Sequence, residues 1–441
     1  MNQLMTIATA LALALLFTRF FKKIGLNFPD VTVFLLTGLL IGPYCLGKLN
    51  IPGFGFESFA EIDEYSFIPT VALGFIAFSI GNEFKLSQIK GIGKQATVIG
   101  ILQAIMAMLI VDAVLLGLIH FNKISVLSNP VAITLGAIAT ATAPAATLMV
   151  VKQYKAHGEL TSLLLPIVAL DDAVGLVAFA ASFGVAQALI SSTVNIVSII
   201  INPIIEITGS CLLGAIMGII LSKVEELFYS NSNRLSMTIA FVFLTIALSS
   251  LSFEIGSVTV SFSSLLVCMM LGTVFCNMCP RSGDIMSRAD MWTTPLNTLF
   301  FVVSGAQLEL GVFKNSVFVL IGIIYVITRS FGKYFGAMIS AKMTGCSKNV
   351  VKYLGYTLLP QAGVAIGMCN QAVNLGIEEG RIIRNIILFA IFVYEIAGPS
   401  ITHWALKRAG DIIETPKDKT NHNRFDTPKD YTTHKAVKKT K

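Results

Sequence analysis

Long apolar runs separated by short polar segments occupy most of the chain. A transmembrane helix needs about 20 consecutive, mainly apolar residues. Thirteen runs come near or exceed that length, near residues 4–19, 31–47, 66–83, 96–120, 129–151, 160–189, 195–222, 235–252, 256–278, 292–309, 315–343, 350–376 and 383–406. The pattern predicts an all-α polytopic membrane protein with about 13 transmembrane helices.

The basic residues alternate between the two sides of this predicted array. Loops after the odd-numbered helices, together with the C-terminal segment, hold 25 of the 32 Lys and Arg residues, and the opposite loops hold five. Because positively charged loops stay in the cytoplasm, we expect an outside N-terminus and a cytoplasmic C-terminus in a bacterial-type inner membrane. The segment 409–441 is polar and basic, and we expect a disordered cytoplasmic tail.

Composition favours the same class of protein and disfavours others. Hydrophobic residues make up 54% of the chain and charged residues 13%, whereas soluble domains carry about 25% charged residues. The net charge of +7 is spread through loops, where it sets topology, so we expect contact with membrane lipid and none with nucleic acid. We find no cofactor motif, and we expect a transporter rather than an enzyme.

Two of the predicted helices carry a central proline at matching positions. Thirteen helices divide into two six-helix halves joined by the seventh, and such halves would be inverted repeats. The fifth and twelfth helices then correspond, and each has its proline among small or polar residues, within residues 139–146 and 358–367. Broken helices expose backbone groups near the membrane midplane, so this pair predicts a substrate site.

Two adjacent aspartates interrupt the sixth apolar run. Asp171 and Asp172 lie in the middle of residues 163–180, which are otherwise apolar. One carboxylate at the bilayer centre already costs several kcal/mol, so two indicate a function. Such a pair exchanges protons and, when ionised, attracts a small cation. This is the chemistry of a proton-coupled cation carrier.

Two basic residues on the eleventh predicted helix could pair with these two acids. Arg329 and Lys333 are four residues apart and share one helix face, and Gly332 and Gly336 on the same helix allow another backbone to approach closely. Buried cations need anionic partners. We therefore expect pairing across the site with the aspartates of the sixth helix.

Two further acids are accessory candidates. Glu395 lies within the thirteenth helix; it either pairs with Arg329 or belongs to a second ion path, and we favour the pairing. Glu83 ends the third helix near the cytoplasmic face, where it would line the ion path or sense pH.

Together these features resemble the monovalent cation–proton antiporters, and in particular the bacterial two-aspartate sodium/proton antiporters. The resemblance covers most of residues 1–408. It is carried by Asp171-Asp172 following Thr142-Ala-Pro-Ala145, by Arg329-x-x-Gly-Lys333-x-x-Gly336, and by Leu73-Gly-Phe-Ile-Ala-Phe-Ser-Ile-Gly-Asn-Glu-Phe84.

The resemblance implies a division of the transmembrane domain. Helices 4–6 and 11–13, about 96–189 and 315–406, would form a core with the fifth and twelfth helices unwound where they cross. A panel of about 1–95 and 235–312 would form a homodimer, and a linker helix would lie at about 195–222. The core would move against the panel like an elevator.

The resemblance also assigns residues to roles. Asp172 would be the principal cation and proton carboxylate, Asp171 the partner of Lys333, and Thr142 a neighbour of the site. Arg329 falls where some members place a structural arginine. Residues 360–363 read Pro-Gln-Ala-Gly and lack the arginine and glutamate of potassium-efflux relatives, which weakens a potassium-efflux function.

The predicted function is exchange of Na⁺, or Li⁺, for H⁺ in pH homeostasis. The ion would bind Asp172, Asp171, Thr142 and backbone carbonyls, since small hard cations prefer oxygen ligands. If Lys333 also releases a proton, two protons exchange for one ion and transport responds to voltage; otherwise it is electroneutral. We expect the electrogenic form. A K⁺/H⁺ antiporter is the alternative, and a sodium-coupled organic-acid symporter is a more distant one.

Overall fold

The computed structural model describes residues 2–412 except 25, 27, 50, 52, 83, 85–92, 122–125, 191–195, 256–257, 309, 312–314 and 373–374. Within its helices and strands, the side chains of 2, 172, 188, 196–200, 202–203, 254–255, 258–259, 363, 370–371 and 377 are also outside the description. Glu83, the side chain of Asp172 and the predicted tail from residue 413 therefore lie outside the described part.

Helices form almost all of the regular structure. In chain order they are α1 (Asn2–Lys23), α2 (Asp30–Ile41), the 3₁₀ helix η1 (Leu46–Leu49), α3 (Phe59–Glu64), α4 (Phe67–Asn82), α6 (Gly93–His120), α7 (Asn129–Ile138), α8 (Pro144–Gln153), α9 (Glu159–Ile190), α10 (Ile196–Glu225), α11 (Asn231–Ser249), α12 (Ser264–Met278), α13 (Ser282–Ala306), α14 (Ser316–Met343), α15 (Lys348–Thr357), α16 (Gly363–Ala372) and α17 (Ile377–Ala409). One short antiparallel hairpin, β1 (Phe253–Ile255) and β2 (Val258–Val260), precedes α12.

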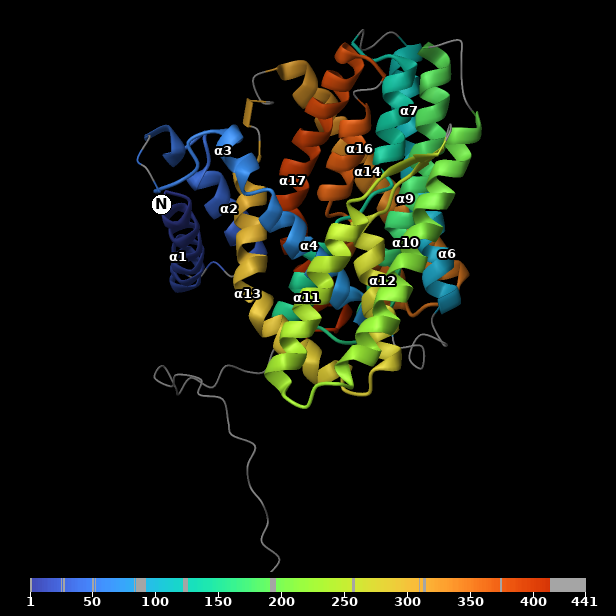
Figure 1. The fold of residues 1–441 in the computed structure, drawn as a ribbon. Helices are drawn as coiled ribbons and strands as arrows, with labels where there is room; N and C mark the ends of the chain where they lie inside the picture. The colour runs from blue at the N-terminus through green and yellow to red at the C-terminus, as the bar shows by residue number, and fades with distance from the viewer. Residues whose placement is uncertain are drawn as a thin grey trace, which may run out of the picture.

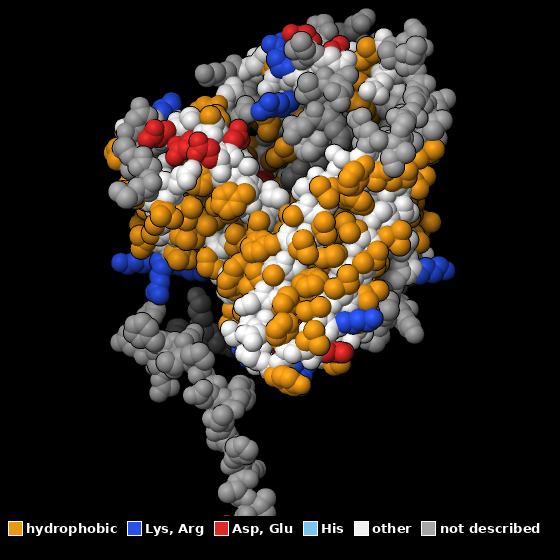
Figure 2. Space-filling view, viewed as in Figure 1, with side chains coloured by type: hydrophobic (Ala, Val, Ile, Leu, Met, Phe, Trp, Pro, Cys, Tyr) orange, Lys and Arg blue, Asp and Glu red, His pale blue; other side chains and the backbone are white. Residues whose placement is uncertain are grey.

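Length and composition identify the helices that can cross a membrane. Eight helices of the described chain are long and apolar enough to span a bilayer, and three shorter apolar helices, α4, α7 and α12, accompany them. Large apolar side chains point outward from these helices, for example Leu16, Leu212 and Phe331. Figure 2 shows such side chains spread over the face formed by α10, α11 and α12, with charged side chains at its lower end. The chain is an integral membrane protein.

Two predicted helix boundaries were wrong. The run near 256–278 begins as the hairpin, and its helix starts only at Ser264, because alternating Val258, Thr259 and Val260 pair as a strand. The run near 292–309 belongs to α13, which starts ten residues earlier, at Ser282. Its first turns carry Asp284 and other charged side chains, so hydropathy alone could not detect them.

The helices pack in two groups, with α1, α2 and α13 at the left of Figure 1 and α6, α7 and α9 at the right. In one group α2 packs against α1 and α13, and α4 packs against α12 and α13. In the other, α6 packs against α14, α7 and α9, and α17 packs against α7, α8, α14, α15 and α16. Helix α10 packs against α11 and α12 of the first group and against α9 of the second. Fewer contacts join the groups, through α2 with α8 and α17 and α4 with α8.

Small residues allow the closest helix crossings. A Cβ atom on Gly38 of α2 would lie 1.9 Å from the Val302 carbonyl oxygen of α13, and one on Gly305 would lie 2.1 Å from that of Leu35. Backbones can approach this closely only where side chains are absent. The α2–α13 contact therefore depends on glycine in both helices.

Candidate functional site

Two broken helices cross at the centre of the second helix group. Helix α7 ends at Ile138 and α8 begins at Pro144, while α15 ends at Thr357 and α16 begins at Gly363. The Ala143 N–H donates to the Pro360 carbonyl at 2.8 Å, so the two connecting segments touch directly. The proline at the start of α8 has no N–H to continue α7. The interruptions predicted from sequence at residues 139–146 and 358–367 are present.

Arg329 satisfies three of the carbonyls that these breaks expose. Its guanidinium donates to the carbonyls of Ala139 at 3.0 Å, Ala141 at 2.6 Å and Leu359 at 2.7 Å, and the side chain is fully buried. The C-terminal end of a helix carries partial negative charge. Arg329 therefore stabilises the ends of α7 and α15 and joins them.

Gln361, within the second break, adds a further bond. Its Nε2 donates to the Ile138 carbonyl at 2.9 Å and to the Tyr325 hydroxyl at 3.1 Å. The side chain is fully buried. The sequence had drawn attention to this residue only as a departure from potassium-efflux relatives, and its role at the crossing was missed.

Lys333 joins the crossing to the aspartate helix. Its ammonium lies 2.8 Å from Asp171 Oδ2 and also donates to Thr142 Oγ1 at 2.9 Å and to the Thr140 carbonyl. The Lys333 and Asp171 side chains are both fully buried. Gln103 of α6, a second residue that sequence reasoning missed, donates to the other oxygen, Asp171 Oδ1. It is the only polar side chain in residues 98–111, and this isolation was the available signal.

Close packing of α14 on α6 brings Lys333 and Gln103 to the same place. A Cβ on Gly332 would lie 2.5 Å from the Ala107 Cα, and one on Gly336 would lie 2.7 Å from the Gln103 Cα. The expected close approach at these two glycines is therefore present, and its partner is α6. It allows side chains of both helices to reach Asp171.

Asp172 follows Asp171 within α9. Successive residues of a helix point about 100° apart. The Asp172 side chain itself is outside the described part of the structure.

The predicted pairing of Arg329 with Glu395 is wrong. Arg329 uses its donors on the three carbonyls, and its Cζ atom lies 4.6 Å from the ring centroid of Tyr394, the neighbour of Glu395. Glu395 is 8% exposed, and its Oε2 atom has no hydrogen-bond partner among the described residues. The helix breaks leave backbone carbonyls without their helical partners, and Arg329 donates to these carbonyls instead of to Glu395. The sequence does not show how many such carbonyls a break leaves.

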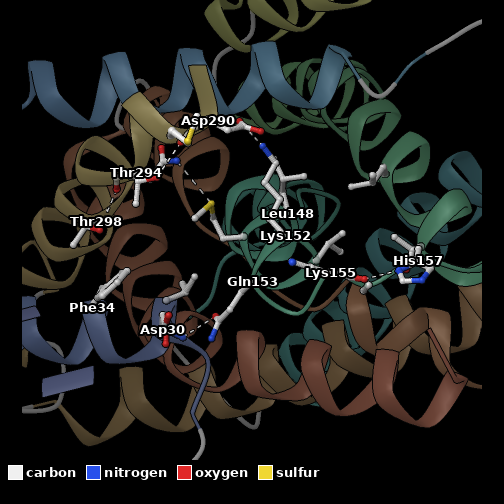
Figure 3. A pocket seen from close by; sticks show the side chains of 18 of the residues that line it. Asp30, Phe34, Leu148, Lys152, Gln153, Lys155, His157, Asp290, Thr294 and Thr298 are labelled. Atoms are coloured by element: carbon white, nitrogen blue, oxygen red, sulfur yellow. Dashed lines mark hydrogen bonds and ion pairs between the residues drawn. The ribbon is translucent and has the colours of Figure 1, made fainter. Parts of the chain in front are cut away.

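A cavity of about 1300 Å³ lies between the two helix groups. Its lining includes Asp30 of α2, Asp290 of α13, and Lys152 and Gln153 of α8. Figure 3 shows Lys152 directed toward Asp290, with a 2.7 Å ion pair, and Gln153 directed toward Asp30, whose N–H it accepts at 2.9 Å.

The inner wall of this cavity is formed by α9. Thr161, Leu165 and Pro166 line it. Asp171 lies five residues beyond Pro166 on the same helix, about 7.5 Å further along its axis. Pro166 is thus the lining residue of α9 that is nearest to the aspartates along the chain.

A membrane protein with two crossed broken helices, buried lysine and arginine on one helix and adjacent aspartates on another has the architecture of an ion-coupled carrier. Residues 8–407 match the family described as "Sodium/hydrogen exchanger, transmembrane". The chain belongs to this family, whose members are transporters and not enzymes.

Individual relatives agree with the family assignment. The chain is 23% identical over 175 residues to the Na(+)/H(+) antiporter NhaS4 of Synechocystis sp. (strain ATCC 27184 / PCC 6803 / Kazusa). That match spans 39% of this chain and 42% of the relative. The matched stretch is less than half of either protein.

Solved structures show the same fold. The sodium proton antiporter MjNhaP1 from Methanocaldococcus jannaschii at pH 8 superposes with a TM-score of 0.69 at 19% identity, covering 93% of this chain and 99% of that one. An electron-microscopy structure of MjNhaP1 gives a TM-score of 0.70 at 18% identity, covering 93% and 98%. At these identities the likeness concerns the fold.

Proposed function

We propose that this protein exchanges Na⁺ or Li⁺ for protons at Asp172, beside the Asp171–Lys333 ion pair. The buried ion pair at the crossing of two broken helices is the observation that carries the proposal. Lys333 and Gln103 together occupy both oxygens of Asp171. The adjacent carboxyl is then the group that holds a proton or a cation, and the two compete because each needs the same oxygens.

Electrostatics at the crossing support this division of roles. Lys333 and Arg329 cap the partially negative carbonyls at the end of α7, and Arg329 also caps those of α15. The partially positive N-termini of α8 and α16 follow directly on the same breaks. An ionised Asp172 beside these groups would be stabilised, while the cation would take oxygen ligands from Asp172, Asp171 and Thr142.

The proposal includes two inverted six-helix repeats within 13 membrane-crossing segments. Counting α7 with α8 and α15 with α16 as single interrupted segments supports the count, and the two breaks occupy matching places. The group containing α6–α9 and α14–α17 would be the moving core. The other group would be the panel that forms a homodimer, with α10 as the linker.

The cavity supports an elevator mechanism and an orientation. It is lined by residues of both groups, and on α9 its lining ends at Pro166, five residues before Asp171. Lys152 and Lys155 line it, and positive loops favour the cytoplasmic side. The structure would then be an inward-open state in a bacterial-type inner membrane, with the N-terminus outside.

Transport in proteoliposomes tests the proposal. A pH-sensitive dye inside the vesicles should respond to added Na⁺ and Li⁺, and Asp172→Asn should abolish the response. Glu206→Gln on α10, a half-buried acid away from the crossing, is the matched control and should keep it. A response to K⁺ alone would favour the potassium alternative, and sodium-driven uptake of an organic acid without proton movement would overturn the proposal.

A further inference from the structure

Glu395 is a buried acid with no role in the site described above. It lies within α17, is 8% exposed, and has an unpartnered Oε2 atom among the described contacts. An ionised carboxylate in this position without a cation would cost several kcal/mol. A proton on the carboxyl removes that penalty.

Three of the cations on helices packed against α17 bind other groups. Within the described chain, the ion pairs do not include Glu395. The helices packed against α17 bring Asp30 on α2, Lys152 on α8, Asp171 on α9, Arg329 and Lys333 on α14, and Lys348 and Lys352 on α15. Lys152 binds Asp290, Lys333 binds Asp171, and Arg329 binds three carbonyls.

Glu395 nevertheless lies close to the moving parts of the proposed carrier. Gly398, one turn away on the same face of α17, packs against the second break: a Cβ there would lie 3.0 Å from Pro360 Cγ. Thr402, a further turn along that face, is fully buried, and its hydroxyl has no hydrogen-bond partner in the described part of the chain. Helix α17 also contacts α2 of the opposite group, so sliding of the groups would change the surroundings of this helix.

From this geometry we propose that Glu395 carries a second proton through the transport cycle. The inference rests on the proposed exchange of cations for protons at Asp172. Lys333, the carrier of the second proton suggested by the sequence, makes bonds to Asp171, Thr142 and Thr140 that hold the crossing together. Deprotonating it would leave at least one of these acceptors without a donor, whereas Glu395 can lose its proton without breaking a bond of its Oε2.

The charges balance for two protons and one cation. In the proton-loaded state of the proposed cycle, Asp172 and Glu395 are both neutral acids. One Na⁺ binds as Asp172 releases its proton, and Glu395 releases the second proton to the same side of the membrane, before the core slides, when a local shift of α17 admits water. Both carboxyls are protonated again on the opposite side. One positive charge moves one way and two move the other, so one net charge crosses in each cycle.

The ratio of protons to cations tests this inference. In proteoliposomes with a clamped voltage, the pH gradient that just stops net flux against a fixed Na⁺ gradient gives the ratio. In wild type, net flux should stop when the pH difference equals half the difference in log Na⁺ concentration, and transport should respond to voltage. In Glu395→Gln, which imitates the protonated acid, net flux should stop when the pH difference equals the whole difference in log Na⁺ concentration. Its transport should not respond to voltage. Lys333→Gln and the control Glu206→Gln should keep the wild-type ratio in whatever flux remains.

If Glu395 had only a structural role, Glu395→Gln would change the rate of transport but not the pH gradient at which net flux stops. An unchanged ratio in Glu395→Gln, or a loss of voltage response in Lys333→Gln instead, would overturn the inference while leaving Na⁺/H⁺ exchange intact. Failure of wild type to exchange Na⁺ for H⁺ would contradict the proposed function itself.

Proton release from purified protein gives a second readout that needs no transport. Addition of Na⁺ to weakly buffered wild-type protein should release twice as many protons per bound ion as in Glu395→Gln, and Glu395→Asp should restore the wild-type value. Equal release in wild type and Glu395→Gln, or complete loss of Na⁺ binding in Glu395→Gln, would contradict a separate second proton.

Discussion

Lys333 Nζ lies 2.8 Å from Asp171 Oδ2, and both side chains are fully buried. This contact joins α14 to α9, and through Thr142 and Thr140 it also joins both to the first helix break. A buried pair of this kind is a poor source of net stability but is costly to break on one side. Because the ion pair lies at the helix crossing, we infer that it orients the side chains of the site.

Removing one partner of this pair should destabilise the protein strongly. Lys333→Ala leaves the Asp171 charge buried and uncompensated, and we expect a loss of about 3–5 kcal/mol. The thermal midpoint of the detergent-solubilised protein measures the effect. Adding Asp171→Asn to Lys333→Ala should recover part of it, and an additive double variant would contradict direct coupling.

Arg329 should require its forked geometry as well as its charge. Arg329→Lys keeps one positive charge but cannot reach the Ala139, Ala141 and Leu359 carbonyls together. Each buried carbonyl left without a donor costs about 1–3 kcal/mol, so the midpoint of unfolding should fall clearly. Arg381→Lys, an exposed change, serves as the control, and equal stability of the two variants would rule out this role.

Gly336 should tolerate no larger side chain. Its Cβ position lies 2.7 Å from the Gln103 Cα, so Gly336→Ala should separate α14 from α6 at a cost of about 1–3 kcal/mol. Gly117→Ala in α6 has open space around it and should be neutral or stabilising by up to about 1 kcal/mol. The thermal midpoints of both variants test this expectation. An unchanged midpoint in Gly336→Ala would contradict the close packing of α14 on α6.

The cavity contacts should distinguish a moving core from a static bundle. Lys152 of α8 and Asp290 of α13 join the two helix groups, whereas Lys22 and Asp30 pair within one group. Cross-linking cysteines at 152 and 290 with a short cleavable thiol reagent should stop transport until a reductant is added. Cross-linking 22 to 30 should leave transport intact. Undiminished flux through the 152–290 cross-link would argue against sliding groups.

The sequence predicted those parts of the site that depend on single residues. Pro144 and Pro360 marked breaks because proline cannot continue a helix, and Asp171 and Lys333 were conspicuous as charges in apolar runs. Bilayer-length runs located most helices. The start of α13 was missed because its first turns leave the apolar region and carry charge.

The partners of Arg329, Gln103 and Gln361 could not be predicted in the same way. Two of these side chains bind backbone carbonyls more than 180 residues away in the chain, and the third binds Asp171, 68 residues away. Which carbonyls a break exposes depends on how the two interrupted helices cross, and that is a property of the packed fold. A neutral amide in an apolar run shows only that some partner is needed.

Calorimetric Na⁺ binding at several pH values tests competition at Asp172 most directly. Because the proton and the cation need the same oxygens, the apparent affinity should fall as pH falls, by about tenfold per pH unit for each competing proton. Asp172→Asn should show no binding at any pH. Affinity independent of pH, or Na⁺ binding retained by Asp172→Asn, would contradict the account.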